Sequence, residues 1–334
     1  MIICRTPFRV SLFGGGTDYP TWYEKHGGAV LGFAIDKYCY ISARKLPPFF
    51  EHKHRIVYSK VENVVSIDEI KHPAVRGVLS QYDLKDGMEI HHDGDLPARS
   101  GLGSSSSFTV GMLNALAAFQ GRMVSKRELA REAIRIEQDV INEKVGCQDQ
   151  IWAAYGGLNR INFFQTGEFD VQPAIVSTAR RTDLQDHLIL VFTGITRLAP
   201  EMAEKQIQNL DAREAQLKEM MAMVDEAQSI LHDERNSISD IGALLHQSWL
   251  LKKELAEGVS NPVIDDIYDA AMNAGASGGK LLGAGGGGFM LFIVEPKKQP
   301  KVREALKKLV AIKTAIDNVG SKIVVYEPAG LESA

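Results

Sequence analysis

The stretch of sequence that decides the fold is Pro97-Ala98-Arg99-Ser100-Gly101-Leu102-Gly103-Ser104-Ser105-Ser106-Ser107. Apolar residues at helical spacing continue to Phe119, which predicts a helix over 102–119 with the serines in its first turn. Glycine lets the backbone approach a ligand, and the free N–H groups of a helix start point outward with the positive end of its dipole. One serine would cap such a helix, so this run of glycines and serines predicts a phosphate-binding site.

The same composition recurs at two other places in the chain. Of the 30 glycines, 13 lie in the segments 14–16, 101–103 and 275–288. Two known phosphate motifs do not fit them. The pair Gly279–Lys280 is followed by leucine and not by serine or threonine, which excludes a P-loop. The dinucleotide pattern at 283–288 precedes a predicted strand over 289–294 where a helix is required.

Composition and charge narrow the class of protein. The 334 residues carry 38 Lys and Arg against 42 Asp and Glu, a balance that argues against a nucleic-acid partner. The chain lacks an apolar run of about 18 residues, so we expect no membrane contact. The three cysteines form neither a disulfide framework nor a zinc motif, and the first residues do not resemble a signal peptide. We therefore expect a cytoplasmic protein.

The predicted secondary structure changes near residue 180, from mainly short strands at the start of the chain to longer helices. The first 60 residues predict short strands, including separate strands over 28–34 and 38–44. The later part predicts one long, methionine-containing helix over 201–231 and a lysine-rich helix over 297–310. We place a domain boundary in the polar stretch around residue 180, giving domains 1–180 and 181–334.

The motif at 97–107 resembles the central nucleotide-binding motif of the GHMP kinases. The segment 7–19 (PFRVSLFGGGTDY) is similar to the N-terminal motif of that family, and 280–289 (KLLGAGGGGF) to its C-terminal glycine motif. Between them, 146–150 (GCQDQ) resembles the segment with the catalytic aspartate of the family, and Glu137 lies where the family keeps a magnesium-binding glutamate. These five features occur in the family order and cover most of the chain.

The resemblance implies a fold and two cofactors. The fold is the α+β, two-domain GHMP kinase fold, with an N-terminal ribosomal-protein-S5-like α/β domain and a C-terminal ferredoxin-like α+β domain. The cofactors are ATP and Mg²⁺. The residues expected to bind the nucleotide are Pro97, Ser100, Gly101, Leu102, Gly103, Ser104, Ser105, Ser106 and Ser107.

The resemblance also implies the metal and catalytic residues. Glu137 and Ser105, or its neighbour Ser104, are expected to bind Mg²⁺, although helical spacing alone would make Glu137 a surface ion-pair partner. Asp149 is expected to orient or deprotonate the acceptor hydroxyl, with Arg9 as its charge partner. An arginine within an apolar strand must find an anion or reach water, which supports a functional role for Arg9.

A further set of residues is expected to contact the substrate: Gly15, Gly16, Thr17, Asp18, Lys280, Gly285 and Gly286. Asp18 is the best candidate for a sugar-hydroxyl ligand. Lys280 is one candidate for binding a substrate phosphate, and the alternatives Arg44, Arg99 and Arg197 stay open.

Within the family, four segments taken together are most similar to the branch that acts on heptose phosphates: GGGTDYP, GAVLGFAIDKY at 28–38, the LPxRSGLGSSSSF form and GGKLLGAGGGGF. Fucokinase and related sugar 1-kinases share the glycine-rich first motif. The resemblance to the heptose phosphate branch implies phosphorylation of the anomeric C1 hydroxyl of D-glycero-D-manno-heptose 7-phosphate for surface-polysaccharide precursors. Two alternatives stay open, a free-sugar 1-kinase acting on fucose or galactose and a non-catalytic regulator that binds ATP and sugar. We expect ATP and a sugar phosphate as partners, and we leave a homodimer open.

Overall fold

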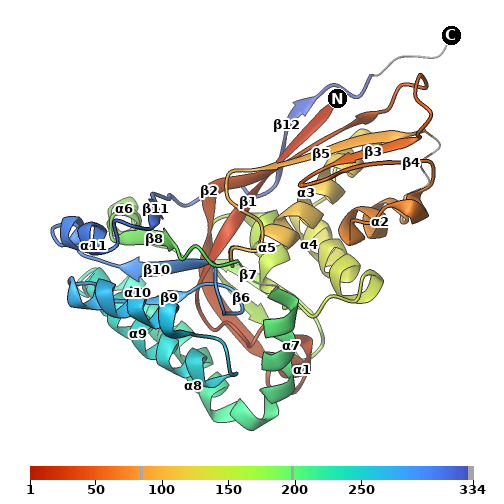
Figure 1. Cartoon of the computed structure of the whole chain (residues 1–334). Coiled ribbons are helices and arrows are strands. Elements are labelled where there is room, and N and C mark those ends of the chain that lie inside the picture. Colours follow the sequence, from red (N-terminus) through yellow and green to blue (C-terminus); the bar gives the residue numbers. More distant parts are fainter. Residues whose placement is uncertain (83, 85, 197–198, 330–334) are drawn as a thin grey trace.

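The computed structural model describes residues 1–329 except 83, 85, 197 and 198, and for 199–201 it describes the backbone alone. Two β-sheets form the framework, and helices cover each of them (Figure 1). The chain passes from the first sheet to the second and then returns to the first. This arrangement is the α+β, two-domain architecture expected from the sequence.

The first sheet has eight strands. Its main path is β12 (Lys322–Tyr326), β1 (Ile2–Phe13), β2 (Gly28–Lys45), β5 (Met88–Gly94), β3 (His54–Val57) and β4 (Val61–Val64), with β6 (Leu158–Phe163) and β7 (Phe169–Pro173) extending from β2. The two strands predicted at 28–34 and 38–44 are one continuous strand, β2. At its centre the N–H of Asp36 donates to the carbonyl of Ala315 over 2.9 Å, so a backbone partner keeps this stretch extended.

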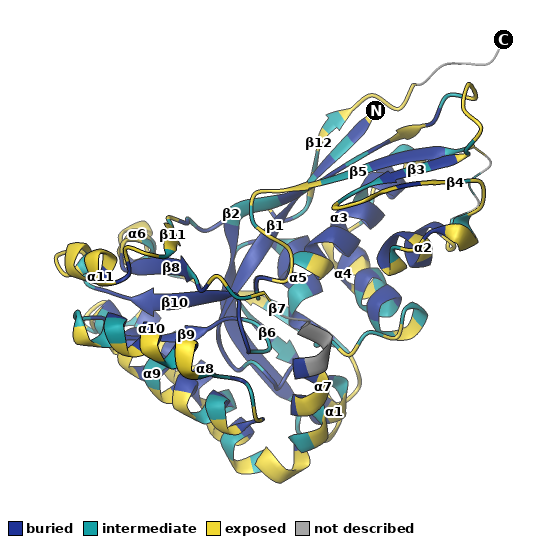
Figure 2. Ribbon diagram, viewed as in Figure 1, coloured by how far each residue is buried: buried dark blue, intermediate teal, exposed yellow. Residues whose placement is uncertain are grey.

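Helices α3 (Ser104–Phe119) and α5 (Gln148–Tyr155) pack directly on the first sheet, and helices α2 (Pro73–Leu79) and α4 (Lys126–Arg135) pack on α3. Figure 2 shows α3 as a largely buried helix at the centre of this domain. It begins at Ser104, two residues after the predicted start, because Gly103 has a left-handed φ of 74° and ends the preceding loop. The phosphate loop, which we define as residues 97–107, therefore includes the first turn of a buried helix.

The helix predicted from Ser125 to about residue 142 changes geometry along its length. Ser125 and Glu128 form the predicted capping box at its start. The α-helical part ends at Arg135, and residues Ile136–Val140 form a π-helical turn. Such wide turns often occur at functional sites. Here the turn carries Glu137, which is 1% exposed.

The second sheet is antiparallel, in the order β11 (Val310–Ile312), β8 (Leu188–Phe192), β10 (Phe289–Ile293) and β9 (Gly278–Leu281). The sequence did not predict β9, because glycine is rare in strands. A β-carbon on Gly278 would lie 1.8 Å from the carbonyl oxygen of Gly242, so helix α9 (Ile238–Glu254) packs directly on the strand backbone. Only glycine allows that approach.

The helices after β7 are α6 (Thr178–Asp186), α7 (Ala199–Asn209), α8 (Glu214–His232), α9, α10 (Pro262–Asn273) and α11 (Gln299–Ala305). Of these, α9 and α10 pack on the second sheet, whereas α8 contacts α9 and strands β1 and β2 of the first sheet. The predicted single helix over 201–231 is wrong. It breaks where Leu210 turns into the core and the side chain of Asn209 donates to the carbonyl of Leu255 over 3.3 Å. The predicted helix over 297–310 is shorter, since residues from Val310 onward pair with β8. None of the described helices is long and apolar enough to cross a membrane.

The predicted boundary at residue 180 falls inside α6, where Ser177 caps the helix by accepting from the N–H of Arg180. The polar stretch is thus a helix and not a linker. In addition, β12 pairs with β1, so residues at both ends of the chain build the first sheet. The second domain is an insertion between β7 and β12, which differs from the simple division at residues 180 and 181.

Candidate active site

The phosphate loop is held from both sides. The backbone N–H of Arg9, on β1, donates to the carbonyl of Leu102 over 3.0 Å. Gly101 has a left-handed φ of 80°, and a β-carbon there would lie 2.6 Å from the carbonyl oxygen of Leu282. The loop therefore needs glycine at this position both for its conformation and for its contact with the second domain.

The four consecutive serines of the loop, residues 104–107, make different contacts. The hydroxyl of Ser107 donates to the carbonyl of Pro7 over 2.8 Å and ties α3 to β1. The hydroxyl of Ser104 accepts from the N–H of Arg99 over 3.2 Å. Ser106 is buried and donates to Glu137, whereas Ser105 is exposed. The structure thus brings Ser106, and not Ser105, into hydrogen-bond contact with the predicted metal-binding glutamate.

Glu137 is a buried carboxylate with one oxygen that can still accept hydrogen bonds or bind a cation. Its Oε2 accepts from the Ser106 hydroxyl over 2.9 Å and from the Gln150 amide over 2.5 Å, while its Oε1 has no partner among the described atoms. Burial, with a smaller contribution from Glu143, raises the pKa of Glu137 from 4.5 to about 7. The surface ion pair that helical spacing suggested is therefore not formed. A hard cation that takes few protein oxygens fits this donor set.

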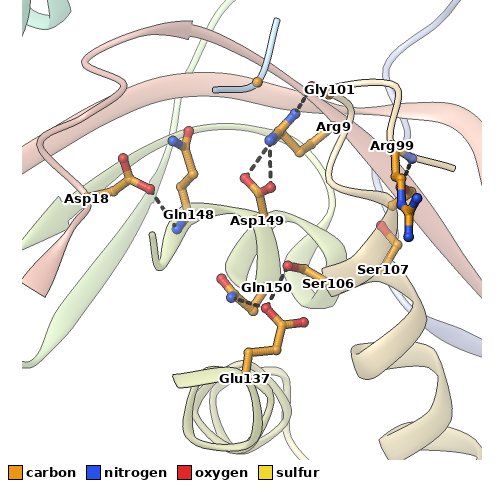
Figure 3. A network of polar contacts seen from close by, with 12 residues as sticks. Arg9, Asp18, Arg99, Gly101, Ser106, Ser107, Glu137, Gln148, Asp149 and Gln150 are labelled. Carbon is orange, nitrogen blue, oxygen red and sulfur yellow. Dashed lines mark hydrogen bonds and ion pairs between the residues drawn. The ribbon is translucent and has the colours of Figure 1, made fainter. Parts of the chain in front are cut away.

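Arg9 and Asp149 face each other across the loop (Figure 3). Arg9 Nε donates to Asp149 Oδ1 over 2.7 Å, and Arg9 Nη2 donates to Asp149 Oδ2 over 2.6 Å. Arg9 Nη1 donates to the carbonyl of Gly101 over 2.6 Å. The arginine is 5% exposed, whereas the side chain of Asp149 is 23% exposed. A two-point pair fixes the carboxylate orientation and still leaves it open to a ligand.

Asp18 is the second carboxylate of the site and is 2% exposed. It accepts from the N–H of Gly16 over 3.0 Å and from the N–H of Gln148 over 3.4 Å. Burial and the neighbouring Asp149 raise the pKa of Asp18 above its ordinary value. A β-carbon on Gly146 would lie 1.9 Å from Asp18 Oδ2, so glycine at 146 is what admits this carboxylate.

Some residues of the glycine-rich first motif hold the loop together, and others face the site. The hydroxyl of Thr17 donates to the carbonyls of Gly14 and Ala29 over 2.8 and 2.9 Å, and it accepts from the N–H of Ala29. This hydroxyl holds the loop, so the expected contact of Thr17 with substrate is not supported. Gly16 packs toward Leu217 of α8, and Gly15 faces Gln148 near Asp149.

The C-terminal glycine turn, residues 283–288, packs directly on the phosphate loop. A β-carbon on Gly283 would lie 2.7 Å from the α-carbon of Gly101, and the N–H of Phe289 donates to the carbonyl of Ser100 over 2.9 Å. Gly285 and Gly286, by contrast, pack against the backbone of Val259. The two glycine-rich segments therefore meet through Gly283 and residues near Gly288, and not through the two glycines predicted to contact substrate.

Two buried lysines lie behind these loops. Lys280 is 3% exposed and donates to the carbonyl of Leu12 over 2.8 Å, so its expected contact with a substrate phosphate is not supported. Burial and nearby Arg9 lower the pKa of Lys280 from 10.5 to about 7. Lys252 was not predicted; it donates to the carbonyls of Leu281 and Gly283 over 2.7 and 2.6 Å. No sequence signal distinguishes it from Lys253.

The other candidate ligands for a substrate phosphate differ in their surroundings. Arg44 contacts Glu89 over 2.5 Å on the first sheet. Arg99 is exposed within the phosphate loop, with a left-handed φ of 59°. Arg197 lies outside the described residues. Gln148 and Gln150 were also not predicted, although they flank Asp149 in the segment 146–150 and their side chains turn to Asp18 and Glu137.

Comparison with known proteins agrees with this geometry. The family model "GHMP kinases N terminal domain" matches residues 69–157, and "GHMP kinases C terminal" matches residues 203–312. A D-glycero-alpha-D-manno-heptose 7-phosphate kinase of Campylobacter jejuni is 33% identical over 316 residues, which cover 91% of this chain and 92% of that protein. A bifunctional fucokinase/GDP-fucose pyrophosphorylase of Arabidopsis thaliana is 26% identical over 90% of this chain and 31% of that protein.

Solved structures show the same fold. A D-glycero-D-manno-heptose 1-phosphate kinase from Bacteroides thetaiotaomicron matches with a TM-score of 0.79 and 22% identity, covering 98% of this chain and all of that one. A galactokinase of Lactococcus lactis, solved with galactose, matches with a TM-score of 0.73 and 19% identity, covering 96% of this chain and 94% of that one.

The fold and these matches together define an enzyme that transfers phosphate from ATP to an alcohol. The chain belongs to the GHMP kinase family. Within that family it is a sugar kinase, as the extent of the match to the heptose phosphate kinase indicates. The family and fold predicted from the sequence are confirmed.

Proposed function

We propose that this chain transfers the γ-phosphate of ATP to the anomeric C1 hydroxyl of D-glycero-D-manno-heptose 7-phosphate. The observation that carries the proposal is the 33% identity to the Campylobacter jejuni heptose 7-phosphate kinase over nearly the whole of both chains. The glycine-rich first motif supports it, because Gly15 places no side chain beside Ser11 and Gln148.

The proposed reaction follows from the Arg9–Asp149 pair. The acceptor oxygen forms a bond to the γ-phosphorus, the bond from that phosphorus to the bridging oxygen breaks, and ADP leaves. The acceptor proton passes to an oxygen of Asp149, whose side chain is the open member of the pair. Each carboxylate oxygen has lone pairs beyond those that Arg9 occupies. Arg9 orients the carboxylate and places positive charge beside the transferred group.

We also propose that Glu137 and Ser106 hold Mg²⁺. The unpartnered Oε1 of Glu137 and its raised pKa favour this role, since a nearby cation would stabilise the ionised carboxylate. The ion would neutralise charge on the ATP phosphates. Exposed Ser105 remains next to this position but does not contact Glu137.

The distal phosphate of the proposed substrate needs a cation. Lys280 is buried against Leu12, and Arg44 is paired with Glu89. Among the candidates with described side chains, Arg99 is the exposed one beside the phosphate loop, so we propose it for this contact.

A kinase assay over several acceptors tests the proposal. Purified protein is given ATP and Mg²⁺ with heptose 7-phosphate, mannose 6-phosphate, fucose or galactose, and ³¹P and ¹³C NMR locate the new phosphate. We expect the highest kcat/KM with heptose 7-phosphate and the product phosphorylated at C1. Preference for free fucose or galactose would instead support a free-sugar 1-kinase, and no ATP consumption with any acceptor would support a non-catalytic role.

A further inference from the structure

Two buried polar atoms on the segments that carry Arg9 and Asp149 have no hydrogen-bond partner among the residues that the structure describes. They are the hydroxyl oxygen of Ser11 and the amide oxygen Oε1 of Gln148. Ser11 is 6% exposed and Gln148 is 9% exposed. Buried polar groups are nearly always paired in native proteins, so two unpaired ones in a substrate site indicate that a ligand completes them.

Both side chains converge on Gly15. A β-carbon built there would lie 3.8 Å from Ser11 Oγ and 3.9 Å from Gln148 Nε2, which are ordinary contact distances. Unlike Gly14 and Gly16, Gly15 does not have a left-handed φ, so its backbone does not require glycine. It is also partly exposed, whereas those two neighbours are buried. Gly15 therefore leaves the position next to Ser11 Oγ and Gln148 Nε2 without a side chain.

The hydrogen-bonding capacities of the two groups are complementary. The backbone N–H of Gln148 donates to Asp18, and the side-chain oxygen Oε1 of Gln148 is left as an acceptor without a partner among the described residues. Figure 3 shows the Gln148 side chain between Asp18 and Asp149. The Ser11 hydroxyl can donate. A single ligand hydroxyl satisfies both groups, because it donates to Gln148 Oε1 and accepts from Ser11 Oγ.

We propose that Ser11, Gly15 and Gln148 form a subsite for one hydroxyl of the acceptor, on the carbon next to the hydroxyl that is phosphorylated. Gln148 precedes Asp149 at the start of α5, so the subsite adjoins the group that faces the acceptor. The subsite selects a vicinal diol over an isolated alcohol. If the acceptor is a sugar phosphorylated at C1, as in the proposed function on which this inference rests, the recognised group is the C2 hydroxyl.

The test compares heptose 7-phosphate with its 2-deoxy analogue in the wild type, Ser11→Ala and Gln148→Met. Methionine keeps the length of glutamine without its polar atoms. In the wild type, we expect the 2-deoxy analogue to lose about 10- to 100-fold in kcat/KM, the range expected when buried polar partners stay unpaired. In each variant this ratio should be smaller than in the wild type, because one of the two groups that read the hydroxyl is gone.

Ser248→Ala is the matched control, since Ser248 also has a buried, unpartnered hydroxyl but lies on helix α9 of the second domain. It should keep the wild-type ratio. ATP affinity measured by calorimetry verifies that each variant is folded, and Ser11→Ala decides the question if Gln148→Met does not fold. A wild-type ratio retained in Ser11→Ala overturns the subsite.

The assay separates this inference from the proposed function. If the wild type prefers another sugar over heptose 7-phosphate, the proposed substrate is wrong, and the same ratio measured with that sugar and its deoxy analogue decides the subsite. If heptose 7-phosphate is the substrate but the wild type uses the 2-deoxy analogue equally well, the proposed function stands and the subsite is overturned.

Discussion

Lys252 offers the sharpest test of how the second domain supports the phosphate loop. Its ammonium group is buried and donates to the carbonyls of Leu281 and Gly283, and Gly283 in turn packs on Gly101. Gly101 accepts from Arg9, the partner of Asp149. Replacing Lys252 by methionine keeps the apolar stem and removes the charge. We expect the glycine turn, and with it the phosphate loop, to lose its fixed position.

The magnitude follows from the groups left behind. Two buried carbonyls without partners cost about 1–3 kcal/mol each. Part of this is offset, because the wild type buries a charge: burial, with Lys280 and Arg9 nearby, lowers the pKa of Lys252 well below 10.5. We therefore expect Lys252→Met to lower the free energy of unfolding by about 2 kcal/mol and kcat by about 10- to 100-fold through misplacement of the reacting groups.

Urea unfolding and steady-state kinetics measure both effects, with Lys253→Met as the control. Lys253 is the next residue on α9, and its ion pair with Asp265 is 3.5 Å long and partly exposed. Such a pair contributes about 0–1 kcal/mol, so Lys253→Met should leave kcat near that of the wild type. The pH dependence of unfolding gives a further test. The folded pKa of Lys252 lies well below its unfolded value of 10.5, so the wild type becomes more stable as pH rises between these two values. Lys252→Met lacks this gain, so the difference in free energy of unfolding between the wild type and the variant should grow over that pH range. Equal unfolding energies and equal kcat in the two variants would refute the reasoning.

Three further predictions concern the catalytic and metal residues. Asp149→Asn should lower kcat at least about 100-fold, the contribution typical of a positioned acid or base, while calorimetry finds ATP affinity little changed; wild-type turnover would exclude the proton-accepting role. Ser106→Ala should raise the Mg²⁺ concentration for half-maximal activity more than Ser105→Ala does, because Ser106 contacts Glu137, and the reverse order in a magnesium titration would contradict the assignment. The pKa of Glu137 is 4.5 in the unfolded chain and about 7 in the folded protein, so this residue should lower the stability of the metal-free protein as pH increases from 4.5 to 7. Glu137→Gln should remove that decrease when the free energy of unfolding is measured against pH. An unchanged profile in the variant would show that the carboxyl is not buried in this way.

Local sequence signals predicted the elements that depend on local interactions. The capping box at Ser125 and the helix that follows the phosphate loop are examples, because their hydrogen bonds join residues close in sequence. Motif order also brought Arg9 and Asp149 together as a predicted pair, although 140 positions separate them. The resemblance to a family, and not the chemistry of either residue alone, supplied that long-range information.

Where the structure departs from the sequence predictions, distant packing is the cause. The assignment of Ser105 as a metal ligand stays a prediction, while the structure places the hydroxyl of Ser106 on Glu137. Lys280 looked available because it lies in a glycine-rich segment, yet its side chain is directed at the carbonyl of Leu12, 268 positions away. Strand β9 was missed because its glycines are explained only by the close approach of α9.

The return of β12 to the first sheet has a consequence for biosynthesis. Ile2 pairs with Ala43 on one side and with Tyr326 on the other. On the ribosome, β1 gains the first partner early, but its other edge stays open until the residues of β12 have emerged. The nascent chain therefore exposes an unpaired strand edge while residues 46–321 are translated, a state that invites pairing with other chains. The active-site strand that carries Arg9 is completed only after the whole second sheet has been translated.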